Sequence, residues 1–458
     1  MKKFMSLLFV SVVALAGCGG SASGSSDGQV TEITLWTASS HYFLGDEKVD
    51  KDGNTYRDES TAVYQIAADE FEKETGIKVN FKRVEPGNEN VDSLVKQNDA
   101  SVDIYAAAPT MTDDQIIEYM EPQFDSVESC EKEYRNCDMF VQSDGNIYAQ
   151  VPSISYDGVI VYNEEVIKAA GYDEVPTDID EFMNMLQAIK DNGVTPIAEH
   201  RIENWPLNTF TLVASYMDNK SDALGELLNY EDPFSVDSPM GKTELLMAEM
   251  VEKGYFEQST YADFGVAMDS VAYGDSGMML LGNWVAPQII SRIPEGETAN
   301  IKVAPFPKAK DDAELNVSIV PNVYFYIPKG SDAKDESQQF IDYLKNNEDI
   351  QKAWAATPNL ADENAFVETI PDYVSDFAAR IEDGEIVTLP NYVYSPNTLA
   401  SQEILKDMGV YADAKFIGNV YDAAQTGGVE AAKKELESLN KQWKAAKEAR
   451  GVEYQEVN

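Results

Sequence analysis

The chain has 458 residues and a formal net charge of −45, from 80 acidic and 35 basic residues. This acidity argues against nucleic acid as a partner, because affinity for phosphates requires clustered Lys and Arg, and we expect it to keep an exported protein soluble. A hydrophobic fraction of 43% excludes global disorder, and the length favours two domains or lobes over one compact core.

Residues 1–17 have the features of a secretory signal peptide. Two lysines follow Met1, and the 13 residues from Phe4 to Ala16 are almost wholly apolar and uncharged. A segment of that length is too short to span a bilayer, which takes roughly 20 residues, but it fits the apolar core of a signal peptide. The following LAGC, which ends at Cys18, resembles the lipobox of bacterial lipoproteins. This resemblance implies cleavage before Cys18 and a diacylglycerol on its sulfur.

Residues 18–30 are rich in Gly and Ser, and we expect them to form a flexible tether with no apolar surface to bury. No later apolar segment is long enough to cross a membrane, so membrane contact is expected through the lipid anchor alone. The sequence therefore predicts a protein outside the cytoplasm, anchored to the outer face of the cell membrane.

The first globular part of the chain shows strands and a helix in alternation. EITLW (32–36) predicts a strand, and residues 61–76 carry apolar positions at helical spacing, with Gly76 at the end. IKVNF (77–81) alternates strictly, and VDIYAAA (102–108) indicates a buried strand. Strand, helix and strand in succession form a βαβ unit, which implies a parallel sheet.

A second set of elements begins after residue 147. Strands are expected at 158–162, 194–198, 278–281 and 323–327, and helices at 164–170, from 177, from 238, at 336–346 and over the tail around 436–446. Thr177 and Asp180 indicate a capping box, and Ser238 followed by Pro239 is a favoured helix start. The chain is therefore predicted to be α/β with two sheets.

Two cysteines remain after the tether, Cys130 and Cys137, and an exported protein can join them in a disulfide. On one continuous helix seven residues rise about 10.5 Å, which exceeds the usual Cα separation of a disulfide. A bridge therefore requires a turn between them. Zinc is disfavoured, because the pair stands alone and neither His41 nor His200 is near in sequence.

Residues 37–60 form a polar insertion that raises the question of calcium. Its acidic end contains Asp50, Asp52, Asn54, Asp58 and Glu59. An EF-hand loop requires Gly at its sixth position, where this chain has Thr55. We therefore interpret the insertion as a solvated acidic loop, and we predict no metal or cofactor.

Several stretches carry a resemblance to one family. They are EITLW with its helix and IKVNF, VDIYAAAP, the run from DGNIYAQVPSISYDGVIVYNEEVIKAAG to GVTPIA, ENWPLNTF, and DSGMMLLGNW. In order and spacing they resemble the extracellular solute-binding proteins of bacterial ABC sugar importers, the group that includes maltose-binding protein. The likeness runs from about residue 32 to near the C-terminus.

This resemblance implies a two-lobed fold whose lobes, each with a mainly parallel sheet flanked by helices, are joined by a hinge. Lobe 1 is expected to comprise 31–152 plus 322–358, and lobe 2 to comprise 153–321 plus 359–458. A carbohydrate binds between the lobes, the hinge closes, and the closed monomer docks on the permease of an ABC importer. Binding supplies the signal, so no enzyme activity is expected.

A sugar receptor needs aromatic rings for the C–H faces and polar side chains for the hydroxyls. Trp284 is the best candidate, because its place matches a family tryptophan and Gly282 allows an unusual backbone path, although a core or hinge-supporting role is the alternative. The other candidates follow strand ends or family positions. The residues expected to contact ligand are Trp284, Trp36, Ser39, Ser40, His41, Tyr156, Asp157, Glu203, Asn204, Trp205, Tyr392 and Tyr394.

Other functions are less well supported by the sequence. GKT at 241–243 lacks the earlier glycine of a phosphate loop, since Val236 stands there, and neither HExxH nor G-x-S-x-G occurs. One alternative is the same fold binding a polyamine, an amino acid or a peptide. A second is a secreted glycoside hydrolase or an adhesin, because a chain with 80 carboxylates can bring two together by chance.

Overall fold

The structure is a computed structural model that describes residues 30–37, 47–49, 55–57, 63–83, 101–106, 111–199, 203–218, 222–256, 264–293, 300–308, 314–354, 357–362, 365–366, 371–392 and 394–452. Its strands are β1 (Glu32–Thr37), β2 (Glu47–Val49), β3 (Thr55–Arg57), β4 (Lys78–Arg83), β5 (Ile104–Ala106), β6 (Ser153–Asn163), β7 (Thr195–Ile197), β8 (Ser276–Gly282), β9 (Ile301–Pro305), β10 (Leu315–Pro321), β11 (Phe325–Tyr326), β12 (Thr357–Pro358) and β13 (Ile386–Pro390).

The α-helices are α1 (Val63–Thr75), α3 (Asp113–Tyr119), α4 (Val127–Cys130), α5 (Glu164–Ala169), α6 (Ile179–Asp191), α7 (Asn208–Asp218), α8 (Pro239–Glu252), α9 (Phe264–Ala272), α10 (Ala286–Ile290), α11 (Lys334–Lys345), α12 (Glu348–Ala353), α13 (Asp372–Glu382), α14 (Pro396–Asp407) and α15 (Lys415–Arg450). Single 3₁₀ turns that matter below are η3 (Cys137–Phe140), η4 (Trp205–Leu207), η6 (Asn283–Val285) and η8 (Ala412–Ala414).

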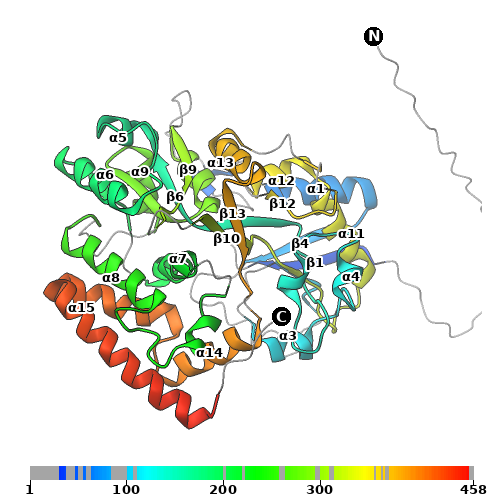
Figure 1. Ribbon diagram of the computed structural model, residues 1–458. Coiled ribbons are helices and arrows are strands. Elements are labelled where there is room, and N and C mark those ends of the chain that lie inside the picture. Colours follow the sequence, from blue (N-terminus) through cyan, green and yellow to red (C-terminus); the bar gives the residue numbers. More distant parts are fainter. Residues whose placement is uncertain are drawn as a thin grey trace, which may run out of the picture.

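The smaller of the two main sheets contains the predicted βαβ unit. Its strand order is β11-β5-β1-β4, with β1 parallel to both β4 and β5 and only β11 antiparallel. Helices α1, α11 and α12 lie beside this sheet (Figure 1), and their apolar side chains share its core. Phe71 packs on Phe340 with ring centroids 5.1 Å apart, and Trp354 donates a hydrogen bond to the Tyr64 hydroxyl.

The larger sheet is built around β6 and has the order β13-β10-β6-β8-β7, with β9 and β12 also paired to β6. Strand β6 is buried along almost its whole length, as its continuous apolar run predicted. The expectation of a mainly parallel sheet is wrong here, because β8, β9, β10 and β12 all run antiparallel to β6. Only the pairs β10–β13 and β7–β8 are parallel.

Helix ends follow local chemistry closely. Gly76, with φ of 77°, ends α1, and the Ser238 side chain accepts a hydrogen bond from the Gly241 amide at the start of α8. The expected capping box at Thr177 is wrong by one residue: Asp178 caps α6 instead, and its carboxylate accepts from the amides of Asp180 and Glu181.

The segments predicted to cross between the lobes lie side by side. Ser153 and Ile154 at the start of β6 pair with β12, and Ile154 and Ser155 pair with Pro321 and Val320 at the end of β10. The two later crossings, at the end of β10 and at β12, are thus both hydrogen-bonded to the first crossing at the start of β6. The exact division of the chain into lobes stays a prediction.

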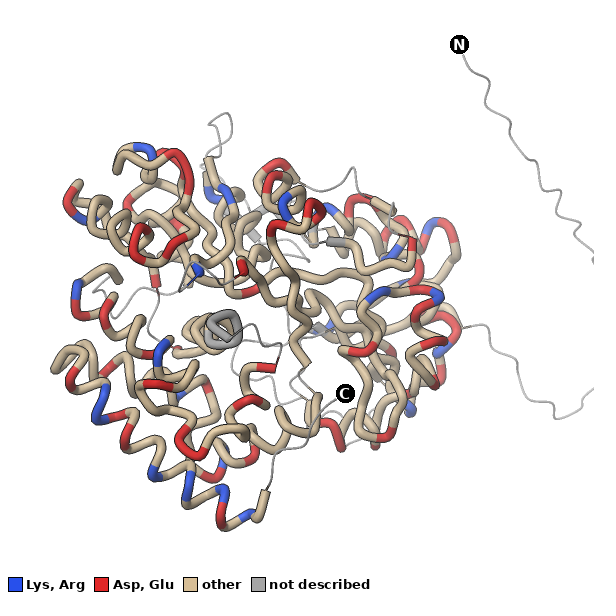
Figure 2. Tube along the Cα trace, viewed as in Figure 1, with Lys and Arg blue, Asp and Glu red and all other residues tan. Residues whose placement is uncertain are grey.

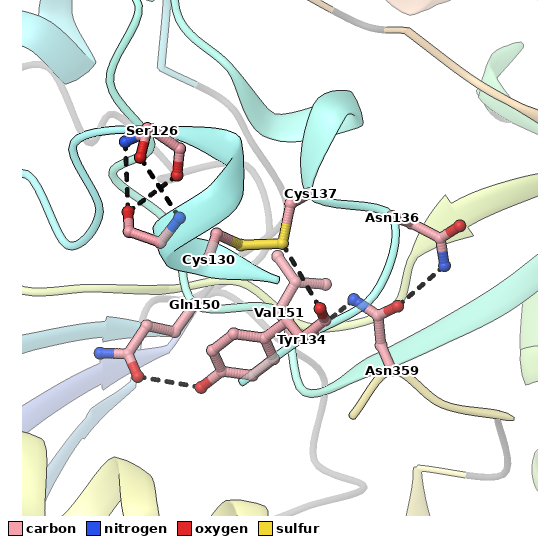
Figure 3. The surroundings of a disulfide bond; sticks show 9 residues. Ser126, Cys130, Tyr134, Asn136, Cys137, Gln150, Val151 and Asn359 are labelled. Carbon is pink, nitrogen blue, oxygen red and sulfur yellow. Dashed lines mark hydrogen bonds between the residues drawn. A yellow bond between two sulfur atoms is a disulfide. The ribbon is translucent and has the colours of Figure 1, made fainter. Parts of the chain in front are cut away.

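A disulfide between Cys130 and Cys137 lies against these crossings (Figure 3). The chain turns between the end of α4 and the start of η3, with φ of 54° at Asn136, and the two Cα atoms are 6.0 Å apart. The Asn136 side chain donates to Asn359 Oδ1 at 2.9 Å, and Asn359 Nδ2 donates to the carbonyl of Val151 at 2.9 Å. The disulfide loop, residues 130–137, is therefore hydrogen-bonded to the segment that follows β12.

Charged residues of both signs are spread along the whole trace, with acidic ones in excess (Figure 2). Within the part of the chain that the structure describes, no helix has both the length and the apolar character needed to cross a membrane. Among the same residues no group of His, Cys, Asp and Glu side chains could hold a metal ion. The five acidic and amide residues weighed for calcium, at 50–59, lie outside the described residues.

Candidate functional site

Three half-buried aromatic rings pack together: Trp205 in η4, Phe264 at the start of α9, and Trp284 in η6. The ring centroids of Trp205 and Phe264 are 5.3 Å apart, those of Phe264 and Trp284 are 6.1 Å apart, and those of the two tryptophans are 6.2 Å apart. We call these three residues the aromatic platform. The two predicted tryptophans are thus brought together by segments nearly eighty residues apart in sequence.

Asp157 of β6 lies at the edge of the platform, where Trp284 Nε1 donates to its Oδ1 at 3.2 Å. A bulge in β6 between Asp157 and Val159 sets this position, and Gly158 adopts the required φ of 72°. Gly282 pairs with Asp157 in extended backbone, at φ of −102°. The unusual backbone path expected at Gly282 is therefore wrong.

The requirement for glycine at position 282 is space. A Cβ there would lie 1.9 Å from Asp157 Oδ1 and 2.3 Å from the Trp284 indole nitrogen, far inside van der Waals contact. Any larger residue would therefore push the carboxylate and the indole apart. The glycine before the tryptophan keeps these two predicted site residues in contact.

Glu203 holds the second tryptophan in the same way that Asp157 holds the first. Trp205 Nε1 donates to Glu203 Oε2 at 2.7 Å. Each indole N–H thus faces a carboxylate of this chain. Asn204 is held differently, because its side-chain amide donates to Asp413 at 3.0 Å.

A group of buried tyrosines lies close to Asp157. Tyr324 and Tyr326 stack in parallel with centroids 6.0 Å apart, and the hydroxyls of Tyr326 and Tyr394 are 3.4 Å apart. Burial, followed by the neighbouring Tyr326 and the Asp157 carboxylate, raises the pKa of Tyr324 well above its usual value. Tyr394, a predicted ligand contact, is therefore one of three neighbouring buried tyrosines that stay neutral. Of these three, Tyr324 interacts with the Asp157 carboxylate.

The remaining aromatic candidates lie in other surroundings. Trp36 is completely buried and packs on Tyr105 at 5.5 Å, and Tyr156 is 5% exposed and packs on Phe377 at 5.4 Å. Successive residues of a strand point to opposite faces, so Tyr156 and Asp157 diverge. The Tyr392 hydroxyl donates to Asp138 in η3 at 2.9 Å. Ligand contact by these three aromatic residues stays a prediction. Ser39, Ser40 and His41 lie outside the described residues, as does Cys18.

Sequence reasoning missed Phe264 and Asp413. Phe264 stands in a stretch, YADFGV, without a strong periodic pattern, and nothing local marks it as a neighbour of either tryptophan. Asp413 begins the C-terminal helical region, where an acidic residue is commonplace. Both are placed by contacts between distant segments, which a single sequence does not reveal.

Burial raises the pKa of the Asp157 carboxyl from its usual value near 4 to about 7, although the bond from Trp284 opposes this. A carboxyl with a higher pKa in the folded state takes up a proton on folding, so its contribution to stability falls as pH rises from about 4 to about 7. In Asp157→Asn the amide oxygen can still accept a hydrogen bond from Trp284, but the side chain does not titrate. We therefore expect this variant not to lose stability as the pH rises through this interval. The free energy of unfolding of the variant should therefore rise relative to the wild type across this interval and stay level above it.

Denaturant titrations of both proteins at pH 4.5, 6 and 8 measure this difference. A difference in unfolding free energy that does not change with pH would show that Asp157 titrates normally.

One hollow lies away from the platform. It has a volume of about 610 Å³ and is lined by residues that include Asn163, Asn192 and Tyr273. Asn163 ends β6, whereas Asp157 lies near the middle of that strand, six residues earlier, so the hollow is displaced along the strand from Asp157. The Tyr273 hydroxyl already donates to the Arg292 carbonyl. This hollow offers no pair of rings with carboxylates, and the aromatic platform is the stronger candidate site.

Comparison with known proteins gives consistent matches. The family described as bacterial extracellular solute-binding protein matches residues 54–351. The multiple sugar-binding protein of Streptococcus mutans is 24% identical over 207 residues, which cover 44% of this chain and 48% of that protein. The aligned part therefore spans about half the length of this curated relative.

Solved structures match over nearly the whole chain. A binding protein of an ABC transporter from Bifidobacterium animalis subsp. lactis, in complex with mannobiose, has a TM-score of 0.75 at 18% identity and covers 92% of this chain and 95% of its own. A receptor of Streptomyces glaucescens, solved unliganded and with acarbose, has a TM-score of 0.64 at 17% identity, with 91% and 99% covered. These likenesses show the two-lobed α/β fold. Because the family match extends over more than half of the chain, the protein belongs to the bacterial extracellular solute-binding proteins.

Proposed function

We propose that this protein is a lipid-anchored receptor that binds a carbohydrate, most suitably an oligosaccharide, between its lobes and delivers it to an ABC importer. The observation that carries the proposal is the aromatic platform with its two carboxylates, Asp157 and Glu203. A sugar ring presents C–H groups that pack on indole faces and hydroxyls that donate to carboxylates. Relatives solved with mannobiose, mannotriose and acarbose support this class of ligand.

The proposed receptor works by binding without catalysis. A ligand that contacts both lobes favours the closed arrangement over the open one, and the closed form is what the permease would recognise. The positions of the buried tyrosines support binding between two lobes. Tyr324 and Tyr326 lie on the segment that follows the second crossing, whereas the aromatic platform lies on the larger sheet and its helices. We propose a monomer for this role.

Isothermal titration of the purified protein tests the proposal. The panel contains mannobiose, mannotriose, chito-oligosaccharides, acarbose and galactose, with spermidine, an amino acid mixture and a short peptide as the non-sugar arm. We expect saturable binding to at least one sugar, accompanied by a change in tryptophan fluorescence. Binding to spermidine, amino acids or the peptide alone would overturn the carbohydrate part.

The cationic solute is the alternative with a specific structural basis. An ammonium group over Trp284 or Trp205 would gain cation–π attraction, and the nearby carboxylates would balance its charge. Such binding should weaken steeply with added salt, whereas binding of a neutral sugar should not. Titrations at two salt concentrations therefore separate the two classes. Release of reducing sugar during incubation with oligosaccharides would favour a glycoside hydrolase instead.

The lipid anchor at Cys18 has its own test. A thioether-linked diacylglycerol supplies two acyl chains, which is enough for stable membrane attachment. We expect Cys18→Ala, expressed in a bacterium with lipoprotein processing, to move the protein from the membrane fraction to the soluble exported fraction. Equal membrane retention of both forms would contradict the anchor.

A further inference from the structure

Asp413 of η8 is hydrogen-bonded to the turn that carries Trp205. Its Oδ1 accepts from the backbone amide of Asn204 at 2.8 Å and from that of Trp205 at 2.9 Å, and its Oδ2 accepts from the Asn204 side chain at 3.0 Å. One carboxylate thus satisfies three N–H donors of two adjacent residues. Charge-assisted bonds of this kind are stronger and more directional than bonds between neutral groups.

The backbone around Asp413 is unusual in a way that fits this task. Asp413 and Ala414 have φ of 54° and 47°, so two consecutive non-glycine residues adopt the left-handed conformation. This conformation is uncommon for any residue with a side chain, and it persists where the surroundings determine it. The turn aims the carboxylate at residues 204–205 just before α15 begins.

The first turn of α15 approaches the same segment closely. A Cβ added at Gly418 would lie 2.4 Å from the Asn204 side-chain oxygen. Only a residue without a side chain allows α15 to pack at this distance. Two independent features of the 413–418 region, a carboxylate and a glycine, therefore fit the turn before Trp205.

We infer that Asp413 is a positioning residue for ligand binding, which fixes the Trp205 ring in the aromatic platform by holding the backbone of residues 204 and 205. Trp205 lies in η4, a single short turn, and its indole N–H donates to Glu203, so the position of the ring relative to Phe264 and Trp284 depends on the backbone of this turn. A receptor gains affinity when its contact surface is fixed before binding, since less freedom is lost on association. The inference rests on the proposed function, because it treats Trp205 as a ligand contact.

Two variants separate positioning from charge. Asp413→Ala removes all three acceptors and also disfavours the left-handed backbone, whereas Asp413→Asn keeps an oxygen for both backbone amides and tolerates that conformation. Asp407→Ala is the matched control, because it removes an exposed carboxylate that accepts from Arg450 at 2.8 Å on α15 without touching residues 204–205. All three variants remove one negative charge.

Hydrogen exchange followed by mass spectrometry over residues 203–207 is the first measurement. We expect faster exchange of the amides of Asn204 and Trp205 in Asp413→Ala, and rates near those of the wild type in Asp413→Asn and Asp407→Ala. The second measurement is affinity for the sugar that binds best in the titration panel. We expect about 10-fold weaker binding for Asp413→Ala, because the Trp205 ring is then no longer fixed before the ligand binds, and less than threefold change for the other two.

Three outcomes would overturn the inference. They are unchanged exchange at residues 204–205 in Asp413→Ala, equal loss of affinity in Asp407→Ala, and faster exchange with affinity unaffected. If the wild-type protein binds no sugar of the panel, affinity for the solute that it does bind replaces the second measurement. Faster exchange with weaker binding of that solute would then uphold positioning by Asp413 while the carbohydrate assignment fails.

Discussion

Replacing Trp284 with alanine should weaken ligand binding by roughly 30-fold or more, because a central tryptophan of a binding surface contributes about 2 kcal/mol or more. The change removes one of the two indole rings of the aromatic platform and leaves Asp157 without its indole donor. The ring is half-buried, so folding should suffer much less than binding. Isothermal titration with the preferred ligand gives the affinity, and denaturant unfolding gives the stability.

Two controls interpret the Trp284 result. Trp284→Phe keeps an aromatic face but loses the N–H that donates to Asp157, so it should retain much of the binding if stacking dominates. Tyr273→Ala removes an aromatic side chain that is 59% exposed at the far end of α9, and it should leave affinity unchanged. Equal affinity of Trp284→Ala and wild type would reduce Trp284 to a supporting residue of the fold.

Removing the disulfide should lower the free energy of unfolding by about 2–3 kcal/mol, as expected for a short cross-linked loop. The loop also carries contacts to the crossings: Arg135 Nη2 donates to the Pro358 carbonyl at 2.5 Å, in addition to the Asn136–Asn359 bond. We therefore expect the double variant C130A/C137A to unfold at lower denaturant, with Asn359 among the first amides to lose protection from exchange.

The wild-type protein treated with a dithiol reductant separates the cross-link from the packing of the sulfur atoms. Both cysteines are only 1% exposed, so reduction requires partial unfolding in denaturant before the reductant can act. Relative to the oxidised wild type, the free energy of unfolding of the refolded, reduced protein should fall by nearly the same amount as that of C130A/C137A. Equal unfolding midpoints of reduced and oxidised protein would show that the loop holds its turn without the bond.

Periodicity was sufficient for most of the fold. The continuous apolar run of β6, the alternation of β4 and the spacing of α1 each led to the correct element, because burial of one face or of both leaves its own apolar pattern along the chain. Strand direction in the larger sheet was not predictable in that way. Both parallel and antiparallel strands that are buried on both faces show the same apolar run, so the antiparallel partners of β6 carry no distinct signal.

The candidate site was predictable only in part, for a related reason. Trp205, Trp284 and Asp157 stand in recognisable stretches, and the structure brings them together through the bulge at Gly158 and the space left at Gly282. Phe264 contacts Trp205 across about 60 residues of chain, and Asp413 contacts Trp205 across 208 residues. A contact between distant segments depends on the packing of whole elements, and its residues need no local pattern.

The disulfide loop has a consequence for the order in which the molecule assembles. Its own closure joins residues seven positions apart, whereas the Asn136–Asn359 contact joins residues 223 positions apart. Closing the long segment costs more chain entropy and must wait for far more of the polypeptide to leave the membrane during export. We therefore expect the loop to be complete first and to serve as the surface on which the last crossing docks, which pulse-labelled exchange at Asn359 during refolding would reveal as late protection.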